Sequence, residues 1–142
     1  MRVKCIGTFL TSDQIKALNA TGEHDYSACF TIGEQYTVLG LTYINDPKKW
    51  ITLLFELYDD KNNMTSTPSC LFEIVDPRPS IFWRARDTFP NFTLWPIEFY
   101  RDFFHDDLRE ERPGLKRVFD IVVDRLTHEF MDTAPTVPRP LI

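Results

Sequence analysis

The chain of 142 residues lacks the short motifs on which nucleotide-binding and serine-hydrolase sites depend. Its five glycines are scattered, and neither GxGxxG, GxxxxGK[ST] nor GxSxG occurs. A phosphate cradle needs clustered glycines before a helix, and a nucleophile elbow needs its serine on a tight strand-to-helix turn. The sequence therefore predicts neither kind of site.

Histidine and cysteine are scarce, with three of each and no CxxC pair. Zinc sites need closely spaced His and Cys ligands, which this pattern does not supply. One grouping, Asp102, His105 and Asp106, has helical spacing and is open to two readings, a metal site or a solvated helix face. We expect no metal and no cofactor, and we interpret the three cysteines as small buried hydrophobes.

Long apolar runs are also missing, so no membrane span is expected, and the N-terminus has no run long enough for a signal peptide. These absences predict a cytoplasmic protein. Acidic residues outnumber basic ones, which gives a net charge of −5. Nucleic-acid binding needs clustered Lys and Arg, so neither nucleic acid nor membrane is an expected partner, whereas a basic protein is compatible with this charge.

Apolar residues make up 43% and aromatic residues 14% of the chain, which favours a packed globule. We predict a single domain over residues 1–142, mainly β over 1–87, helical over 95–132, with an extended proline-rich tail over 133–142. Alternation predicts a strand over 50–58 whose core face is Ile51, Leu53, Phe55 and Leu57. A turn over 59–63 and a strand over 70–76 should follow. Further strands are expected over 3–7, on both sides of a hairpin corner at Gly33-Glu34, and finally over 80–87.

Apolar residues at helical spacing predict three helices. A short one is capped by Thr11 or Ser12, a second runs from Pro96 to Leu108 with Phe103 beside its apolar stripe, and a third covers 115–130. Lys116/Asp120 and Arg125/Glu129 should pair on the third. The fold class is therefore α+β: a small antiparallel barrel or curled sheet followed by two C-terminal amphipathic helices.

Two surface features are candidates for binding a partner. The first is the acidic run over residues 101–111, and the second is the hairpin tip after the 50–58 strand, where an aromatic residue precedes two acids. Each also has an ordinary interpretation, a solvated helix end or a plain turn. The candidate partner-binding residues are Tyr58, Asp59, Asp60, Asp102, Asp106, Asp107, Glu110 and Glu111.

The segments VKCIG, FTIGEQYTVLG, LFELYDDKNN and CLFEIVDPRPSIFW resemble, in this order, the small SH3-like barrel modules of bacterial proteins. The resemblance covers residues 2–83 and implies a small barrel. The chain departs from it at Asn62-Asn63, which replace the usual Gly, and in an insertion between Gly7 and Cys29. The C-terminal part, LWPIEFYRDFFHDDL and FDIVVDRLTHEF, is similar to helices in immunity proteins of bacterial polymorphic-toxin systems, of the contact-dependent-inhibition or type VI secretion kind. This second resemblance implies a non-enzymatic antitoxin that binds and neutralises one toxin domain.

Three functions follow as hypotheses. The first is a cytosolic, non-enzymatic protein inhibitor of a cognate toxin or effector, itself basic. The second is an SH3-like module that binds a peptide or small ligand, for which two or more of Tyr36, Tyr43, Trp50 and Tyr58 would have to line a groove. The third is an enzyme assisted by a metal held at Asp102, His105 and Asp106.

Overall fold

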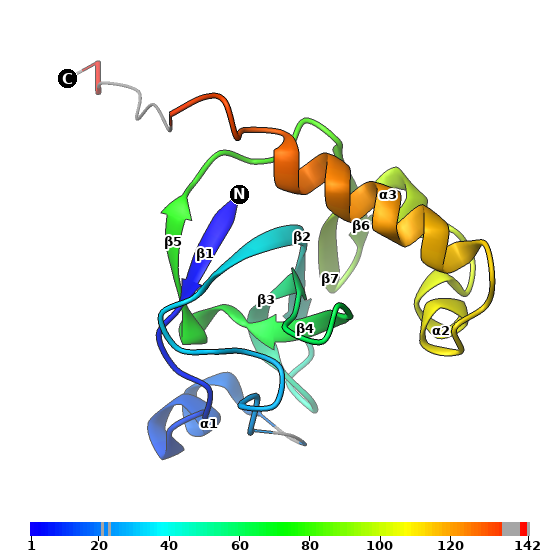
Figure 1. Ribbon diagram of the computed structural model, residues 1–142. Coiled ribbons are helices and arrows are strands. Elements are labelled where there is room, and N and C mark those ends of the chain that lie inside the picture. The colour runs from blue at the N-terminus through cyan, green and yellow to red at the C-terminus, as the bar shows by residue number, and fades with distance from the viewer. Residues whose placement is uncertain (21, 23, 135–139, 142) are drawn as a thin grey trace.

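The computed structural model describes residues 1–20, 22, 24–134 and 140–141 (Figure 1). Within them, seven strands precede two C-terminal helices. The strands are β1 (Arg2–Cys5), β2 (Gln35–Asn45), β3 (Ile51–Tyr58), β4 (Met64–Pro68), β5 (Phe72–Asp76), β6 (Trp83–Thr88) and β7 (Asn91–Pro96). The helices are α1 (Ser12–Leu18), α2 (Phe104–Arg109) and α3 (Leu115–His128), with 3-10 turns η1 (Ser69–Leu71) and η2 (Ile97–Tyr100). No helix in this part of the chain is long and apolar enough to cross a bilayer.

All strand pairs are antiparallel, in the order β4-β3-β2-β1-β5, and β7 joins β2 and carries β6. The long strand β2 is therefore central: Gln35 to Thr37 pair with β1, and Leu41 to Tyr43 pair with β7. The sheet is not closed into a barrel, so of the two expected forms, a small SH3-like barrel or a curled sheet, the barrel is wrong. The α+β class and the order of sheet before helices are confirmed.

The larger hydrophobic core lies on one face of the sheet, where α1 and the loop before β2 cover it. Ile15 and Leu18 of α1 pack against it, and Phe30 meets Tyr36 and Phe72 edge to face, with ring centroids 5.0 and 5.3 Å apart. Its buried members are Val3, Cys5, Leu10, Tyr26, Phe30, Tyr36, Val38, Phe55, Leu57, Leu71, Phe72 and Trp83.

A second core lies between the opposite face of the sheet and the C-terminal helices. Helix α3 lies across this face (Figure 1) and buries residues spaced three and four apart, as an amphipathic helix does. The buried members of the second core are Leu39, Phe99, Phe104, Leu115, Phe119, Val122, Val123 and Leu126. Because the central strands β2 and β3 lie between the two cores, alternation along them does not separate a core face from a solvent face.

Strand β3 shows this effect. Phe55 and Leu57 are buried as predicted, but the neighbouring Leu54 and Glu56 are buried as well, and Ile51 at the end of the strand is exposed. The prediction of one core face over 51–57 is therefore half wrong. The sequence pattern did not show that the C-terminal helices cover the face of β3 that was expected to meet solvent.

Strands β2 and β7 approach closely at Gly40 of β2. The β2–β3 register shifts between Val38 and Gly40, and Leu94 and Trp95 of β7 lie next to the glycine. A Cβ at this position would lie 2.7 Å from Cδ1 of Trp95 and 3.0 Å from the carbonyl oxygen of Leu94. Only a residue without a side chain fits here.

Glu56 places a carboxyl group in the interior of the sheet, where 3% of the residue is exposed. The Thr42 hydroxyl donates to Oε1 at 2.8 Å, and the Ser66 hydroxyl donates to Oε2. Trp95 Nε1 in turn donates to Thr42 Oγ1 at 2.9 Å. Burial raises the pKa of Glu56, and the two hydroxyl hydrogen bonds offset part of that effect. Compared with the unfolded chain, the fold thus shifts this carboxyl group toward its neutral form.

Three expectations about local structure are corrected. Residues 27–32 form turns and irregular structure instead of a strand, and β2 pairs with β1, next to which Cys5 N donates to Glu34 O. The strand expected over 80–87 is followed by a further strand, β7, which ends at Pro96. The helix expected from Pro96 to Leu108 is instead η2, a break at Arg101 to Phe103, and the short α2.

Other expectations are confirmed. Thr11 caps α1 in a capping box with Gln14, the 59–63 turn joins β3 to β4, and α3 covers 115–128. Lys116 pairs with Asp120 at 3.0 Å, but the expected pairing of Arg125 with Glu129 is wrong, because Arg125 pairs with Glu98. The tail expected over 133–142 falls mostly on residues 135–139 and 142, which lie outside the described part of the chain.

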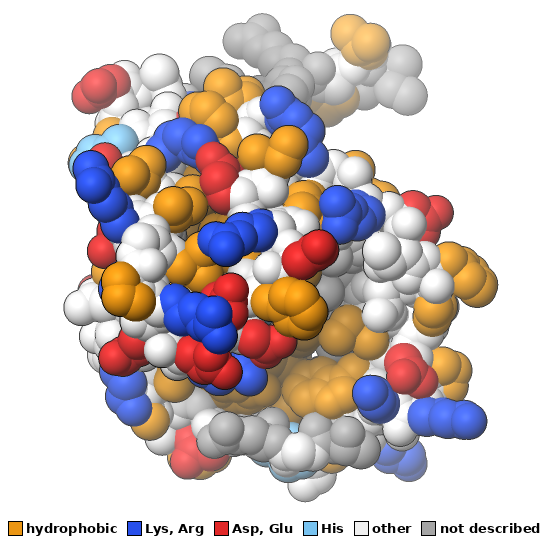
Figure 2. All heavy atoms as spheres, turned by 90° about the vertical axis from the view of Figure 1, so that its right-hand side faces the viewer, with side chains coloured by type: hydrophobic (Ala, Val, Ile, Leu, Met, Phe, Trp, Pro, Cys, Tyr) orange, Lys and Arg blue, Asp and Glu red, His pale blue; other side chains and the backbone are white. Residues whose placement is uncertain are grey.

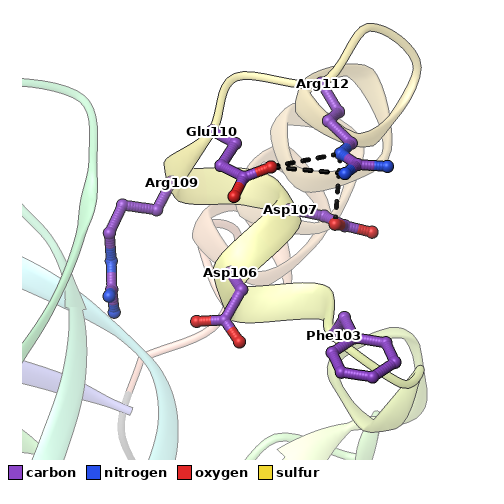
Figure 3. A pocket seen from close by; sticks show the side chains of 6 residues that line it. All are labelled: Phe103, Asp106, Asp107, Arg109, Glu110 and Arg112. Carbon is purple, nitrogen blue, oxygen red and sulfur yellow. Dashed lines mark hydrogen bonds and ion pairs between the residues drawn. The ribbon is translucent and has the colours of Figure 1, made fainter.

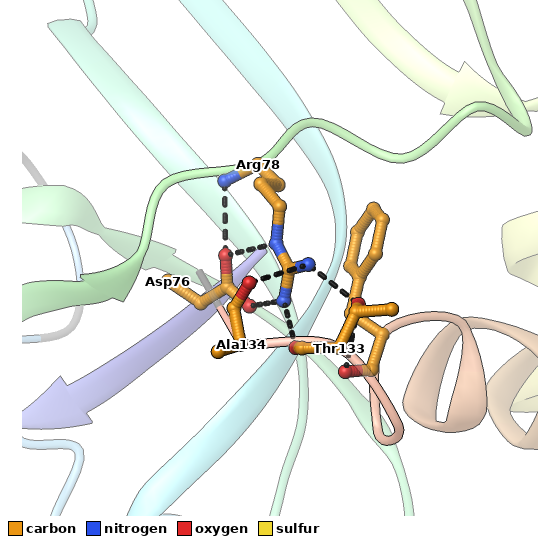
Figure 4. Close-up of polar contacts among 5 residues, drawn as sticks. Asp76, Arg78, Thr133 and Ala134 are labelled. Atoms are coloured by element: carbon orange, nitrogen blue, oxygen red, sulfur yellow. Dashed lines mark hydrogen bonds and ion pairs between the residues drawn. The ribbon is translucent and has the colours of Figure 1, made fainter. Parts of the chain in front are cut away.

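The C-terminal end of α3 is joined to the sheet by Arg78, in the connection after β5 (Figure 4). Its guanidinium donates to both carboxylate oxygens of Asp76, at 3.0 and 2.7 Å, and to Oγ1 and the carbonyl oxygen of Thr133, at 2.7 and 3.0 Å. The same group lies 4.1 Å from the ring centroid of Phe130. These contacts fix the segment after α3 against β5.

Candidate functional site

The candidate site is built around a break in the chain between η2 and α2. Phe103 adopts a left-handed conformation, with φ 61° and ψ 15°, which is unfavourable for a bulky residue. Its successor Phe104 begins α2, is buried, and stacks on Phe99 with ring centroids 4.9 Å apart. Phe103 points the other way and is 75% exposed. The break therefore splits two consecutive phenylalanines between the core and the surface.

A pocket of about 470 Å³ lies beside Phe103 on the outer side of α2. In Figure 3 the Phe103 ring stands at one end and Arg112 at the other. Arg112 lies 3.2 Å from the Asp107 carboxylate and 3.3 Å from that of Glu110. We call this surface the α2 face, defined by its lining residues Phe103, Asp106, Asp107, Arg109, Glu110 and Arg112.

The α2 face and its flanks carry a surplus of negative charge. The segment 102–112 holds five carboxylates against two arginines. Arg112 is shared by Asp107 and Glu110, whereas Asp102, Asp106 and Glu111 have no ion pair among the described residues. Figure 2, which turns this side toward the viewer, shows acidic side chains gathered beside basic and apolar ones. The surface offers an exposed aromatic ring within a negative field.

The structure places the predicted acidic residues unequally. Asp106, Asp107 and Glu110 line the pocket, while Asp102 and Glu111 are exposed just outside it. The sequence missed the roles of Phe103, Arg109 and Arg112. Phe103 was predicted to lie beside the apolar stripe of a continuous helix, so the break that turns its ring to the surface was not predicted.

His105 lies behind this face as part of an aromatic cluster. Its ring is 4.8 Å from that of Trp95, and it meets Phe104 edge to face at 5.7 Å. Burial lowers the pKa of His105, with the nearby charge of Asp106 acting against that shift. Across the described part of the chain, no three His, Cys, Asp or Glu side chains are grouped so that they could hold a metal ion. The geometry gives the grouping of Asp102, His105 and Asp106 no support as a metal site.

The hairpin tip uses its acidic groups to build the turn. Asp59 is 5% exposed; its Oδ1 accepts hydrogen bonds from the amides of Lys61 and Asn63, both at 2.9 Å, and its Oδ2 accepts one from Thr65 Oγ1. Such local bonds stabilise a turn and leave Asp59 no free edge for a partner.

Asp60 is more exposed but is also engaged. Its carboxylate accepts from Thr31 Oγ1 at 2.8 Å and from the Tyr36 hydroxyl at 2.9 Å, which ties the tip to the loop before β2. Tyr58 is half-buried, with its ring 6.1 Å from that of Phe119. The hairpin tip therefore has less to offer a partner than the α2 face.

The two predicted surfaces nevertheless lie on the same side of the fold. Lys116, at the start of α3, donates from Nζ to the carbonyl oxygen of Asn62 at 3.2 Å. Tyr58 packs beneath the same helix, against Phe119. The hairpin tip thus borders the first turn of α3, which follows α2 in the chain.

The four aromatic residues of the alternative hypothesis are dispersed. Tyr36 is buried, Trp50 and Tyr58 are half-buried, and Tyr43 is exposed on β2. None of them lines the α2 face or the second pocket described below. The arrangement does not favour a groove formed by these side chains.

The three cysteines are buried to different degrees. Cys5 is buried and its thiol donates to the carbonyl oxygen of Gly7 at 3.3 Å, while Cys29 and Cys70 are half-buried. Burial raises the pKa of Cys5 and of Cys70. A raised pKa disfavours the thiolate, which is the nucleophilic form.

Comparison of the chain with protein-family models, with curated proteins and with solved structures found no match in any of the three.

Proposed function

We propose that this chain is a protein-binding inhibitor, an immunity protein that neutralises a cognate basic toxin or effector domain in the bacterial cytoplasm, and that it binds this partner through the α2 face. The observation that carries the proposal is the exposed, conformationally strained Phe103 at the rim of a negatively charged pocket. The absence of enzymatic activity and the likeness to SH3-like modules and immunity proteins come from the sequence and remain predictions.

Phe103 has the properties of an interface anchor. Aromatic anchors that fill a partner's pocket supply a large part of the energy of many interfaces. Holding a phenylalanine in a left-handed conformation costs on the order of 1 kcal/mol, which an exposed ring does not recover within the free protein. Burial of the ring in a complex would offset that cost.

The acidic residues supply a different contribution. Asp102, Asp106 and Glu111 have no described ion pair, so their charges remain available to a basic partner. Exposed charges of this kind accelerate association more than they slow dissociation, and salt screens their effect. The α2 face should therefore combine an apolar anchor with electrostatic steering.

The test is a pull-down of the tagged chain against the product of the gene immediately upstream, followed by association kinetics at two salt concentrations. We expect a one-to-one complex whose association slows at high salt. The triple variant Asp102→Asn, Asp106→Asn, Glu111→Gln removes the three carboxylates that have no described ion pair, so it should associate more slowly at low salt and lose most of the salt dependence.

A matched control removes three acidic charges elsewhere. Asp13, Glu34 and Glu73 lie on α1, before β2 and on β5, all away from α2 in Figure 1. Their replacement by Asn, Gln and Gln makes the same change in net charge. Equal slowing by both triple variants would show that net charge alone matters and would reject the α2 face as the binding surface.

A further inference from the structure

A second pocket, of about 410 Å³, lies next to the α2 face. Phe103 belongs to the first pocket and Phe104 to the second, so the two pockets flank the same stretch of backbone. The second pocket differs in its charge and its lining. The lining residues that matter here are Arg86, Ile97, Tyr100, Arg101, Leu115 and Val118.

The charged groups of this pocket that have no ion pair among the described residues are two arginines, Arg86 and Arg101. Neither Arg86 nor Arg101 has a carboxylate within ion-pair distance among the residues that the structure describes. The one acid in the lining, Glu98, is held by both terminal nitrogens of Arg125, at 2.9 and 3.0 Å. Its charge is already compensated, so the pocket is positive on a protein whose net charge is negative.

Tyr100 orients one of these arginines. The guanidinium carbon of Arg86 lies 4.2 Å from the centroid of the Tyr100 ring. The Tyr100 hydroxyl donates to the carbonyl oxygen of Arg84 at 2.8 Å and shares a hydrogen bond of 2.8 Å with Thr93 Oγ1. The ring is therefore fixed, and stacking on it holds the guanidinium at the edge of the pocket.

The rest of the pocket surface is apolar and open to solvent. Ile97 is 66% exposed and Val118 is 37% exposed, and Ile121 extends this surface one turn further along α3 at 56%. Two unpaired guanidinium groups beside exposed aliphatic side chains form a complement to a carboxylate that carries an apolar group. A water molecule has no apolar group for the aliphatic side chains, and a cation is repelled by the guanidinium groups, so neither complements both parts of this surface.

We propose that this pocket receives an acidic side chain of the partner protein, with its carboxylate between Arg86 and Arg101 and its apolar neighbour against Ile97 and Val118. This inference rests on the proposed function and deepens it. The partner then presents a basic surface to the α2 face and an acidic, apolar element one pocket away. A uniformly basic protein would meet Arg86 and Arg101 with like charge and be rejected.

The first experiment tests the pocket without a partner. Hexanoate is titrated into the isotope-labelled full chain, with hexanamide and hexylamine as matched neutral and cationic probes, and shifts are followed at the Ile97 and Val118 methyl groups and the arginine side chains. We expect saturable binding of hexanoate and weaker or no binding of the other two. Arg101→Gln should weaken hexanoate binding by about tenfold, the size of one hydrogen bond to a charged group.

Arg117→Gln is the matched control, because Arg117 is an exposed arginine of α3 outside both pockets. It should leave hexanoate binding unchanged. Equal binding of all three probes, or equal loss in Arg101→Gln and Arg117→Gln, would overturn the pocket's preference for a carboxylate.

The second experiment uses the complex with the upstream gene product. Arg86→Gln and Arg101→Gln should each weaken it by about tenfold, with Arg117→Gln unchanged. If the complex forms and both pocket variants bind like the parent chain, the proposed role of the pocket in the interface is wrong, whatever the hexanoate result. If no complex forms, the proposed function fails, and the hexanoate titration alone decides whether the pocket recognises carboxylates.

Discussion

Replacement of Phe103 by glycine should separate binding from folding. The residue is 75% exposed, so about a quarter of its side chain is buried, and its removal should cost the fold roughly 0.5 kcal/mol of apolar burial. Glycine relieves the left-handed strain, worth about 1 to 2 kcal/mol, but adds about 0.5 to 1 kcal/mol of unfolded-state entropy. These terms nearly cancel, so the free energy of unfolding should change by less than about 1 kcal/mol.

The affinity for the partner should fall far more. An interface anchor contributes about 2 kcal/mol or more, which is a loss of roughly thirtyfold in Kd. Urea denaturation measures the first quantity, and calorimetric titration of the complex measures the second. Phe103→Asn adds a check, because asparagine tolerates the left-handed region yet lacks the ring, and it should behave like Phe103→Gly.

The matched control is Phe89→Ala. Phe89 is an exposed phenylalanine at the β6–β7 turn, and it lines neither pocket. Wild-type affinity in Phe103→Gly would refute the anchor role. Equal weakening by both variants would point to a general loss of surface hydrophobicity instead, and a loss of more than about 2 kcal/mol in unfolding free energy would refute the strain argument.

Three further predictions concern the fold. Gly40→Ala should lower the free energy of unfolding by about 1 to 3 kcal/mol, because its Cβ would overlap Trp95; denaturant unfolding measures this, and an unchanged midpoint would contradict the close packing. Because the pKa of Glu56 is raised in the folded state, its contribution to the free energy of unfolding is fully present at low pH and is lost as the pH rises from about 4 toward the folded-state pKa. The variant Glu56→Gln should lack this pH dependence, and parallel profiles of unfolding free energy against pH for the two proteins would contradict the prediction. Arg78→Ala should lower the melting temperature and speed amide exchange at the C-terminal end of α3, with Lys at this position failing to restore both bonds to Asp76; exchange that stays slow would exclude the clamp.

The parts of the fold that were predictable from sequence are those set by local signals. The capping box of α1, the turn after β3 and the amphipathic period of α3 each depend on neighbouring residues and were found. The strands β4 and β7 and the second core were missed. The face of β3 toward α3 includes Glu56, a residue type that a sequence pattern assigns to solvent, and its burial depends on Thr42 and Ser66 from other strands.

The candidate site was predictable in composition and not in geometry. The acidic run was evident, but the pairing of Arg112 with Asp107 and Glu110 decides which charges stay available, and that pairing depends on how α2 ends. The hairpin-tip residue Asp59 was an equally good candidate by sequence. In the structure its carboxylate accepts hydrogen bonds from the amides two and four residues later, and composition alone does not predict these bonds.

Helix α3 is anchored at both of its ends, by Lys116 to the β3–β4 turn and, just beyond its last turn, by the Arg78 contacts with Thr133. Contacts at both ends keep the helix, and the side chains that it carries, in a constant orientation relative to the sheet. The two pockets beside it would then need little ordering when a partner docks, so less conformational entropy is lost and encounter geometry governs the speed of capture. For an inhibitor that must intercept its target before the target acts, such a ready-made surface favours fast capture.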